Sequence, residues 1–315
     1  MIGRVVEIAQ DGRHLSVHRG FMVVEEDGNE LGRIPLDDIG AVIASAHGLT
    51  YSNNFLVALA ERNVPFVLSA ANHSPVAFLW PVEGHHQQAA RMDAQIEATK
   101  PMAKRLWQDV VRSKIGHQAA ALAYLGRPTA PLEILIPSVK SGDPENIEAQ
   151  AARRYWGLAF GPDFRRDRAA PGINALLNYG YMVIRAACAR AIMGAGLHPS
   201  LGIHHRNANN AMQLVDDLME PFRPLIDLTV MGLTMDGCQD VTPDAKKVLA
   251  STVHADMRTD DGLSPVMGCM SKLATSLGLV YESKRDSLDL PKPQRPLEMD
   301  IPRLNSPGPT PHDDD

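Results

Sequence analysis

The sequence predicts an α+β protein in which a small β-rich N-terminal domain is followed by a larger all-helical C-terminal domain. Two observations favour this class: apolar residues alternate with a period near two over about the first eighty residues, and long Ala-rich helical stretches follow Pro81. A third observation bears on the domain organisation: the end of the chain is rich in proline and finishes in three aspartates. We therefore expect four parts, namely a β-rich domain (1–82), a linker with the start of the helical region (83–100), a helical domain (101–285) and a disordered acidic tail (286–315).

Short apolar runs bounded by turn residues predict the strands of the N-terminal domain. These runs cover residues 5–8, 15–17, 21–24, 31–34, 39–43 and 64–68. Asp27-Gly28 separates two of the runs and is typical of a tight β-hairpin. A helical pattern at residues 55–59 precedes the last strand.

Helical periodicity then predicts segments at 87–100, 102–125 and 173–193. Asp143-Pro144 has the residues expected at the cap and first turn of another helix. Gly194-Ala195-Gly196 follows a helix rather than a strand and lacks a third glycine, so it indicates a helix stop rather than a dinucleotide-binding loop.

Composition narrows the functional classes. With 31 Lys+Arg against 37 Asp+Glu, the net charge of -6 excludes a uniformly basic DNA-binding protein. No run approaches the roughly 20 apolar residues of a membrane span, and the chain starts in strand-like sequence rather than a leader, so we expect a cytoplasmic protein without membrane contact. The three cysteines are far apart, which argues against a disulfide framework and a thiolate zinc site.

Two short segments carry side chains suited to chemistry. Glu148 lies early in a predicted helix, and Ala151 and Ala152 are small enough to let a ligand approach its carboxylate. Residues 201–207 then place His204 beside His205 in a segment between two helices. Taken separately, a glutamate near a helix start is often only a surface residue, and a histidine pair is often a hydrogen-bonded loop.

A third segment combines an apolar helical stripe with a charged column. At 100° per residue, Asp217, Glu220 and Arg223 share one side. The opposite side is formed by Leu214, Val215, Leu218, Phe222 and Leu225. The simplest interpretation of the column is a solvated face with ion pairs, and the alternative is a ligand-binding set.

One imidazole and two carboxylates from separate segments favour the second interpretation. Such a mixed nitrogen and oxygen set suits Mg²⁺ or Mn²⁺, and either ion can polarise a phosphoryl oxygen in phosphodiester chemistry. Binding of a DNA backbone also needs positive charge around the site. Nearby in sequence are Arg153, Arg154, Arg165, Arg166, Arg168 and Arg206.

Three strings in a fixed order carry a family resemblance. Residues 146–156 read NIEAQAARRYW, residues 201–207 read LGIHHRN, and residues 216–227 read DDLMEPFRPLID. Together they closely resemble the CRISPR-associated spacer-acquisition integrases, in the form found in type II systems. The resemblance covers roughly residues 1–285. Ala149 stands where many relatives have glycine, and residues 210–213 replace a more aromatic segment.

The resemblance implies both an activity and a set of site residues. Glu148, His205 and Glu220 would be the catalytic ligands of Mg²⁺ or Mn²⁺, with Asp217 as a supporting or alternative ligand and His204 as their neighbour. The implied enzyme is a DNA endonuclease and integrase that inserts short foreign DNA (spacers) into a CRISPR array during antiviral defence, by attack of a 3′-hydroxyl on a repeat phosphodiester. The candidate DNA contacts are Arg153, Arg154, Arg165, Arg166 and Arg206.

The resemblance also implies partners. The family forms homodimers through its β-rich domains, and two dimers flank a dimer of a small ferredoxin-like adaptation protein, in a four-plus-two complex that binds a short double-stranded spacer precursor and the CRISPR repeat. Two other classes stay open on the residues alone. A non-catalytic DNA-binding scaffold would show no metal dependence, and a metal-dependent phosphohydrolase of small phosphoesters would show no preference for DNA ends.

Overall fold

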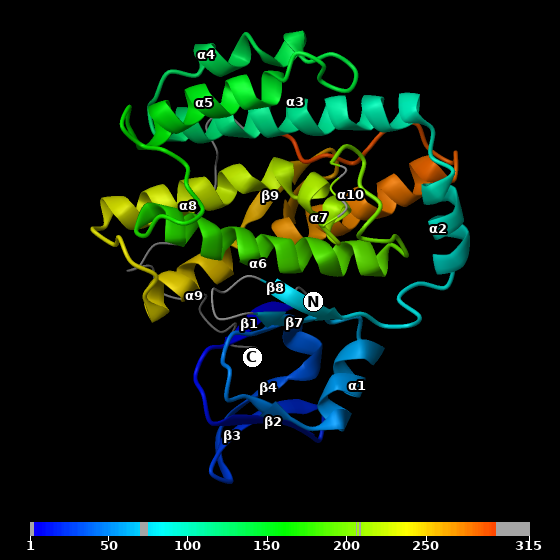
Figure 1. Ribbon diagram of the computed structural model, residues 1–315, viewed down its shortest axis with the longest axis vertical. Helices are drawn as coiled ribbons and strands as arrows, with labels where there is room; N and C mark the ends of the chain where they lie inside the picture. The colour runs from blue at the N-terminus through cyan, green and yellow to red at the C-terminus, as the bar shows by residue number, and fades with distance from the viewer. Residues whose placement is uncertain (1–2, 70–74, 206, 208, 294–315) are drawn as a thin grey trace.

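The protein is described by a computed structural model that covers residues 3–69, 75–205, 207 and 209–293. A β-rich N-terminal part lies against a larger stack of helices, with β2, β3 and β4 at the bottom of Figure 1 and α3, α4 and α5 at the top. This arrangement confirms the mixed class predicted from the sequence, with strands concentrated in the N-terminal region and helices in the C-terminal part.

In its described residues, the N-terminal part contains two four-stranded sheets and the helix α1. The first sheet has the order β1-β5-β7-β8 and the second the order β4-β3-β2-β6. Their elements are β1 (Arg4–Ile8), β2 (Arg13–His18), β3 (Phe21–Glu26), β4 (Asn29–Pro35), β5 (Ile39–Ala44), β6 (Thr50–Tyr51), α1 (Asn53–Glu61), β7 (Phe66–Ser69) and β8 (Pro75–Leu79), with a 3₁₀ turn, η1 (Leu36–Asp38), before β5. The strands expected from the period-two runs are therefore present.

The predicted hairpin is also present, joining β3 and β4 in antiparallel register. Asp27 and Gly28 have φ values of 49° and 77°. A two-residue hairpin turn of the common type needs positive φ at both positions, which aspartate and glycine tolerate better than most residues.

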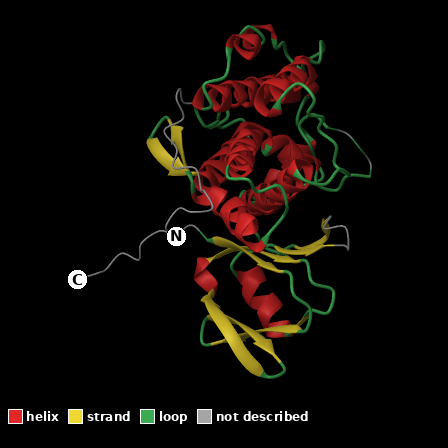
Figure 2. Ribbon diagram, turned by 90° about the vertical axis from the view of Figure 1, so that its left-hand side faces the viewer, coloured by secondary structure: helices red, strands yellow, loops and turns green. Residues whose placement is uncertain are grey.

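Strand β5 joins the two parts of the molecule, because its two faces pack into different cores. Ala41 and Ile43 belong to the large helical core, whereas Val42 and Ala44 belong to the core beneath α1. Successive side chains of a strand point to opposite faces, so a strand covered on both sides reads as a continuous apolar run. Figure 2 shows this sheet between the helices and the remaining strands.

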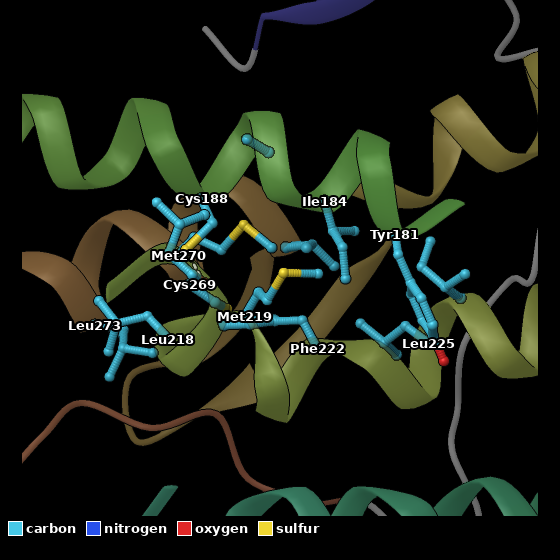
Figure 3. Packing of buried hydrophobic residues seen from close by; sticks show 14 of the residues in the cluster. Tyr181, Ile184, Cys188, Leu218, Met219, Phe222, Leu225, Cys269, Met270 and Leu273 are labelled. Carbon is cyan, nitrogen blue, oxygen red and sulfur yellow. Dashed lines mark hydrogen bonds between the residues drawn. The ribbon is translucent and has the colours of Figure 1, made fainter. Parts of the chain in front are cut away.

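The C-terminal part is built from helices that surround one core. They are α2 (Gln88–Ile96), α3 (Lys100–Tyr124), α4 (Ala130–Glu133), η2 (Ile136–Ser138), α5 (Ile147–Phe160), α6 (Ile173–Gly194), α7 (Gln213–Leu218), η3 (Glu220–Phe222), α8 (Arg223–Met235), α9 (Pro243–Ser251), η4 (Thr252–His254) and α10 (Val266–Tyr281). Figure 3 shows the side chains of α6, the 213–235 region and α10 meeting in this core, among them Cys188, Phe222 and Met270. The apolar stripe predicted for residues 214–225 is buried here.

Two predictions about the helical part need correction. The expected all-helical domain contains a short antiparallel hairpin, β9 (Asp256–Thr259) and β10 (Gly262–Pro265), whose four-residue strands are too short to show a clear period. The helix expected to begin at Asp143 begins instead at Ile147. Asn146 is its N-cap, with a left-handed φ of 52°, and the Asp143 carboxylate accepts hydrogen bonds from the backbone of the first turn.

The end of the described chain packs against this domain. Leu288 is buried, and the backbone nitrogen of Lys292 donates to the carbonyl oxygen of Arg258 in β9 at 2.8 Å. Of the expected tail at 286–315, residues 286–293 thus contact the helical domain at Leu288 and Lys292, and residues 294–315 lie outside the described residues. Cys188, Cys238 and Cys269 are free thiols. Among the described helices, none is long and apolar enough to cross a membrane.

Candidate functional site

Four segments bring the predicted site residues together beside the middle of α3. Glu148 comes from the first turn of α5, Glu220 from the short η3 turn, and His205 from the segment that precedes α7. Helix α3 packs against both α5 and η3, and its Lys114 side chain lies between their carboxylates. Residues separated by more than seventy positions in the sequence therefore share one site.

Glu148 is held by the way its helix begins. The Asp143 carboxylate accepts hydrogen bonds from the backbone nitrogens of Ile147 and Glu148, at 2.8 and 3.0 Å, and the Asn146 side chain accepts one from Ala149. Capping of this kind satisfies backbone donors that have no partner within the helix. The first turn, and with it the Glu148 side chain, is thereby fixed in position.

Lys114 is the central cation of the site. Its Nζ lies 2.5 Å from Glu148 Oε1 and 2.6 Å from Glu220 Oε2. Burial disfavours a charged ammonium, but the Glu220 and Glu148 carboxylates outweigh this effect and raise the pKa of Lys114 above its usual value. A buried charge of this kind is stable only while its partners remain.

Glu220 is held from its other side by Arg223. Arg223 Nε donates to Glu220 Oε1 at 2.8 Å, and the guanidinium lies over the Tyr181 ring, 4.6 Å from its centroid. Burial favours the neutral acid, but Arg223 and then Lys114 lower the pKa of Glu220 to about 2. Tyr181 in turn donates to Asp227, whose pKa burial raises to about 7. Glu220 is thus a fully ionised carboxylate at neutral pH, set in a rigid network.

His205 is positioned by a fully buried carboxylate. Its Nδ1 lies 2.5 Å from Asp217 Oδ1, and the hydrogen bond to Asp217 raises the pKa of His205 against the effect of burial. The second oxygen of Asp217 accepts from the backbone nitrogen of His204 at 2.9 Å. Because Nδ1 is used in this way, Nε2 is the nitrogen of His205 that is free to bind a ligand.

His204, next to it, has a different role. Its ring stacks on Trp107 of α3, with centroids 4.4 Å apart and an angle of 4° between the planes, and burial lowers its pKa. Gly202 lets this segment pass close to Asp217, because a Cβ atom there would lie 2.8 Å from the His205 carbonyl oxygen and 3.0 Å from Asp217 Oδ2. The stacked ring and the glycine together fix the direction of the histidine pair.

The groups present fit a divalent cation. Glu148 and Glu220 direct one oxygen each toward the same positively charged point. Glu220 Oε2 is buried, and the Lys114 ammonium lies 2.6 Å from it. Within the described ranges, no three His, Cys, Asp or Glu side chains already surround one point in the manner of a metal site. The donor types are those that Mg²⁺ and Mn²⁺ accept, and Lys114 stands between two of them.

The candidate DNA contacts fall into two groups. Arg153, Arg154 and Arg165 are exposed, and each donates to a backbone carbonyl nearby. Arg166 is half-buried and turned inward, with its guanidinium on the side-chain oxygens of Asn174 and Asn178. Arg206 lies outside the described residues.

The sequence interpretation missed Lys114 and Trp107. A signal was available for the lysine, because Lys114 lies four residues after Val110 and one before Ile115 on the buried face of α3. A charged residue within an apolar helical face needs a partner of opposite charge. Trp107 carried no comparable signal, since aromatic residues are common in cores.

Two carboxylates around one cation, beside an exposed and oriented imidazole on a mixed α/β scaffold, are an arrangement that suits the nuclease and integrase class. The family model described as "CRISPR associated protein Cas1" matches residues 6–245 of the chain, and the chain belongs to this family. The family resemblance predicted from the three motifs is therefore confirmed.

Individual relatives agree with this assignment. The chain is 34% identical over 291 residues to the CRISPR-associated endonuclease Cas1 of Neisseria meningitidis, a match that covers 90% of this chain and 95% of the relative and is consistent with the type II branch. Its fold is similar to that of a casposase bound to integration product, with a TM-score of 0.77, 20% identity and coverage of 91% and 92%. A chain of a Cas6-RT-Cas1–Cas2 complex matches with a TM-score of 0.72 and 18% identity, over 94% of this chain and 36% of that chain.

Proposed function

We propose that this chain is a divalent-metal-dependent DNA endonuclease and integrase that inserts spacers into a CRISPR array. The observation that carries the proposal is the convergence of the Glu148 and Glu220 carboxylates on one cation position, next to a His205 ring oriented by Asp217. Membership of a family whose curated relatives are named endonucleases supports it. The fold shared with a casposase supports the integrase activity.

The proposed reaction is a transesterification of DNA. The 3′-hydroxyl of the incoming DNA loses its proton as its oxygen attacks a phosphorus atom of the repeat and forms a new phosphodiester bond. The bond to the departing 3′-oxygen breaks, and this oxygen takes up a proton. In nuclease assays, water replaces the 3′-hydroxyl. Mg²⁺ or Mn²⁺ held by Glu148, His205 and Glu220 would supply Lewis-acid activation of the phosphodiester and of the attacking oxygen.

The protein's own contribution is to hold its groups in position. Asp217 keeps His205 Nδ1 engaged, so that Nε2 faces the ligand, and Arg223 keeps Glu220 ionised and in place. Arg153 and Arg154 lie on the exposed side of α5, the helix that carries Glu148, where they can contact phosphates. Such groups need no rearrangement during the reaction, which lowers its barrier.

We further propose that the protein works in an assembly. The likeness to a chain of a Cas1–Cas2 complex supports a partnership with a small Cas2 protein. In this proposal homodimers form through the β-rich domain, and two of them flank a Cas2 dimer in the four-plus-two arrangement. The DNA ligands are a short spacer precursor and the CRISPR repeat.

His205→Ala tests the proposal. With purified partner protein, a short DNA with free 3′-OH ends and a repeat-containing plasmid, the unaltered protein should integrate and cleave DNA in Mn²⁺ or Mg²⁺ and stop in EDTA. His205→Ala should lose both activities, by at least about 100-fold, because its metal ligand is gone. His47→Ala, which removes an exposed histidine distant in sequence from these groups, is the control and should retain activity.

Two other outcomes would favour the alternative classes. DNA binding without any metal-dependent reaction would indicate a non-catalytic scaffold. Hydrolysis of mononucleotides without preference for DNA ends would indicate a phosphohydrolase of small phosphoesters. Unimpaired activity of His205→Ala would contradict the assigned site.

A further inference from the structure

We infer that Lys114 competes with the metal for its site: the ammonium holds Glu148 and Glu220 together in the metal-free protein and leaves its position between them when a divalent cation binds. The inference rests on the proposed function, because it requires that the two carboxylates are metal ligands. It adds a role for a lysine that none of the three family motifs contains.

The first step concerns space. Lys114 Nζ lies 2.5 and 2.6 Å from one oxygen of each carboxylate, so these two oxygens are no farther apart than the two distances together. Mg²⁺ binds carboxylate oxygens at about 2.0–2.1 Å. A divalent ion bound to the same two oxygens would replace Nζ as their common partner, because an ammonium held only a few ångströms from the ion would be strongly repelled by it.

The second step concerns charge. Within the described part of the chain, Lys114 is the one cation within ion-pair distance of Glu148, whereas Glu220 also has Arg223 on its other oxygen. Without Lys114 or a metal, two carboxylates of like charge would face each other in a partly buried site. The ammonium keeps this site intact until a cation of higher charge replaces it.

The third step concerns the path of the side chain. Lys114 is fixed through α3, but its four-carbon stem has freely rotatable bonds. The side chains of His205 and Glu148 are 45% and 24% exposed, so the site opens to solvent on their side. An ammonium displaced in that direction can pair with an anionic group held at the same site, such as a phosphodiester.

Metal affinity in the absence of DNA tests the inference directly. The Mn²⁺ dissociation constant, measured by calorimetry, should be about tenfold lower for Lys114→Met than for the unaltered protein. The reason is that a competing positive charge has been removed. Lys247→Met is the matched control, because Lys247 pairs with Asp244 in an exposed ion pair on α9 and should leave the constant unchanged. Lys114→Gln, which can still donate to the carboxylates, gives a second variant if the methionine variant does not fold.

The unaltered protein offers an independent measurement. An amine-reactive reagent followed by peptide mass spectrometry should modify Lys114 slowly in EDTA and several-fold faster after addition of Mn²⁺, while modification of Lys247 stays constant. This experiment needs no substitution and does not depend on enzymatic activity.

The outcomes separate the two proposals. Equal or weaker Mn²⁺ binding by both Lys114 variants, or modification of Lys114 that does not respond to Mn²⁺ in a protein that binds the ion, would overturn the displacement and leave the proposed function standing. If neither the unaltered protein nor the variants bind Mn²⁺, both the proposed metal site and the displacement of Lys114 are contradicted.

Discussion

Asp217 shows how much of this site depends on a residue that need not contact a ligand. Its side chain is fully buried, yet both carboxylate oxygens are used, one by the His205 ring and the other by the backbone of His204. Histidines that bind metals commonly donate their second ring nitrogen to such a carboxylate, which fixes the tautomer and the direction of the ring. Asp217 is therefore a positioning residue for His205.

Asp217→Asn should weaken Mn²⁺ binding and DNA cleavage by roughly 10- to 100-fold, the usual cost of losing such a partner, while leaving the fold intact. The amide has the shape of the carboxylate but carries no charge to orient the imidazole. Calorimetry and cleavage rates provide the measurements. Asp216→Asn is the comparison, because this neighbour pairs with Arg185 instead and should affect metal affinity little. Equal effects of the two substitutions would contradict the positioning role.

At the scale of residues, the sequence predicted candidate site residues where a motif was available, and it missed those that only a contact in the folded protein reveals. Glu148, His205 and Glu220 were identified from three strings, and the structure brings them to one place. Lys114 belongs to none of these strings. It forms ion pairs with Glu148 and Glu220, which lie 34 and 106 positions away in the sequence. Only the packing of α3 against α5 and η3 makes the lysine part of the site.

At the scale of elements, helix α3 is the one whose stability should depend on pH, because its middle carries two buried ionisable side chains. Besides Lys114 it holds His117, whose Nδ1 donates to the Ser113 carbonyl oxygen at 2.8 Å. His117 Nε2 is buried and has no hydrogen-bond partner in the described structure. Burial lowers the pKa of His117 from 6.5 to about 4, so the folded protein keeps the ring neutral.

This shift predicts a loss of stability in acid. Between about pH 6.5 and pH 4 the unfolded chain binds a proton at His117 and the folded chain does not, so the free energy of unfolding should fall as the pH is lowered. The loss from this residue amounts to up to about 3 kcal/mol and is complete near pH 4. Urea unfolding measured across this range should show a pH slope that is smaller by up to one proton in His117→Asn.

The decisive quantity is the slope of the free energy of unfolding against pH. The stability at a single pH is less informative, because the substitution by Asn also removes buried volume. His47→Asn, which alters an exposed histidine, is the control substitution. An identical slope in His117→Asn and the unaltered protein would show that His117 is protonated to the same degree in both states.

Element types were predictable from sequence, whereas breaks within a helical pattern were harder to place. The column of Asp217, Glu220 and Arg223 was predicted on one helix, but the structure divides it among α7, η3 and α8. Pro221 and Pro224 lie at the starts of η3 and α8, where the absence of a backbone N–H is tolerated. In the structure Asp217 and Glu220 of this column are buried, so the column is not the solvated face that was the simplest interpretation.

At the scale of the whole molecule, the net charge of -6 conceals a separation of charges. Acidic groups are buried at the site, where Lys114 and Arg223 neutralise Glu220. Exposed arginines lie on and just after α5. A protein of this kind can bind DNA locally while remaining acidic overall, because counterion release depends on the cations that contact phosphates rather than on total charge.

The salt dependence of DNA binding tests this view. If Arg153 and Arg154 each contact a phosphate, replacing both by glutamine should reduce the slope of log K against log salt by about two and weaken binding to all sequences alike. Fluorescence anisotropy with a short duplex between low and moderate salt gives the slope, and Lys247→Gln controls for removal of an exposed charge elsewhere. Arg166→Gln should instead lower the melting temperature with little change in slope, because its guanidinium is bound to Asn174 and Asn178. An unchanged slope in the double variant would exclude α5 from the DNA path and move the search for phosphate contacts to other basic residues of the helical part.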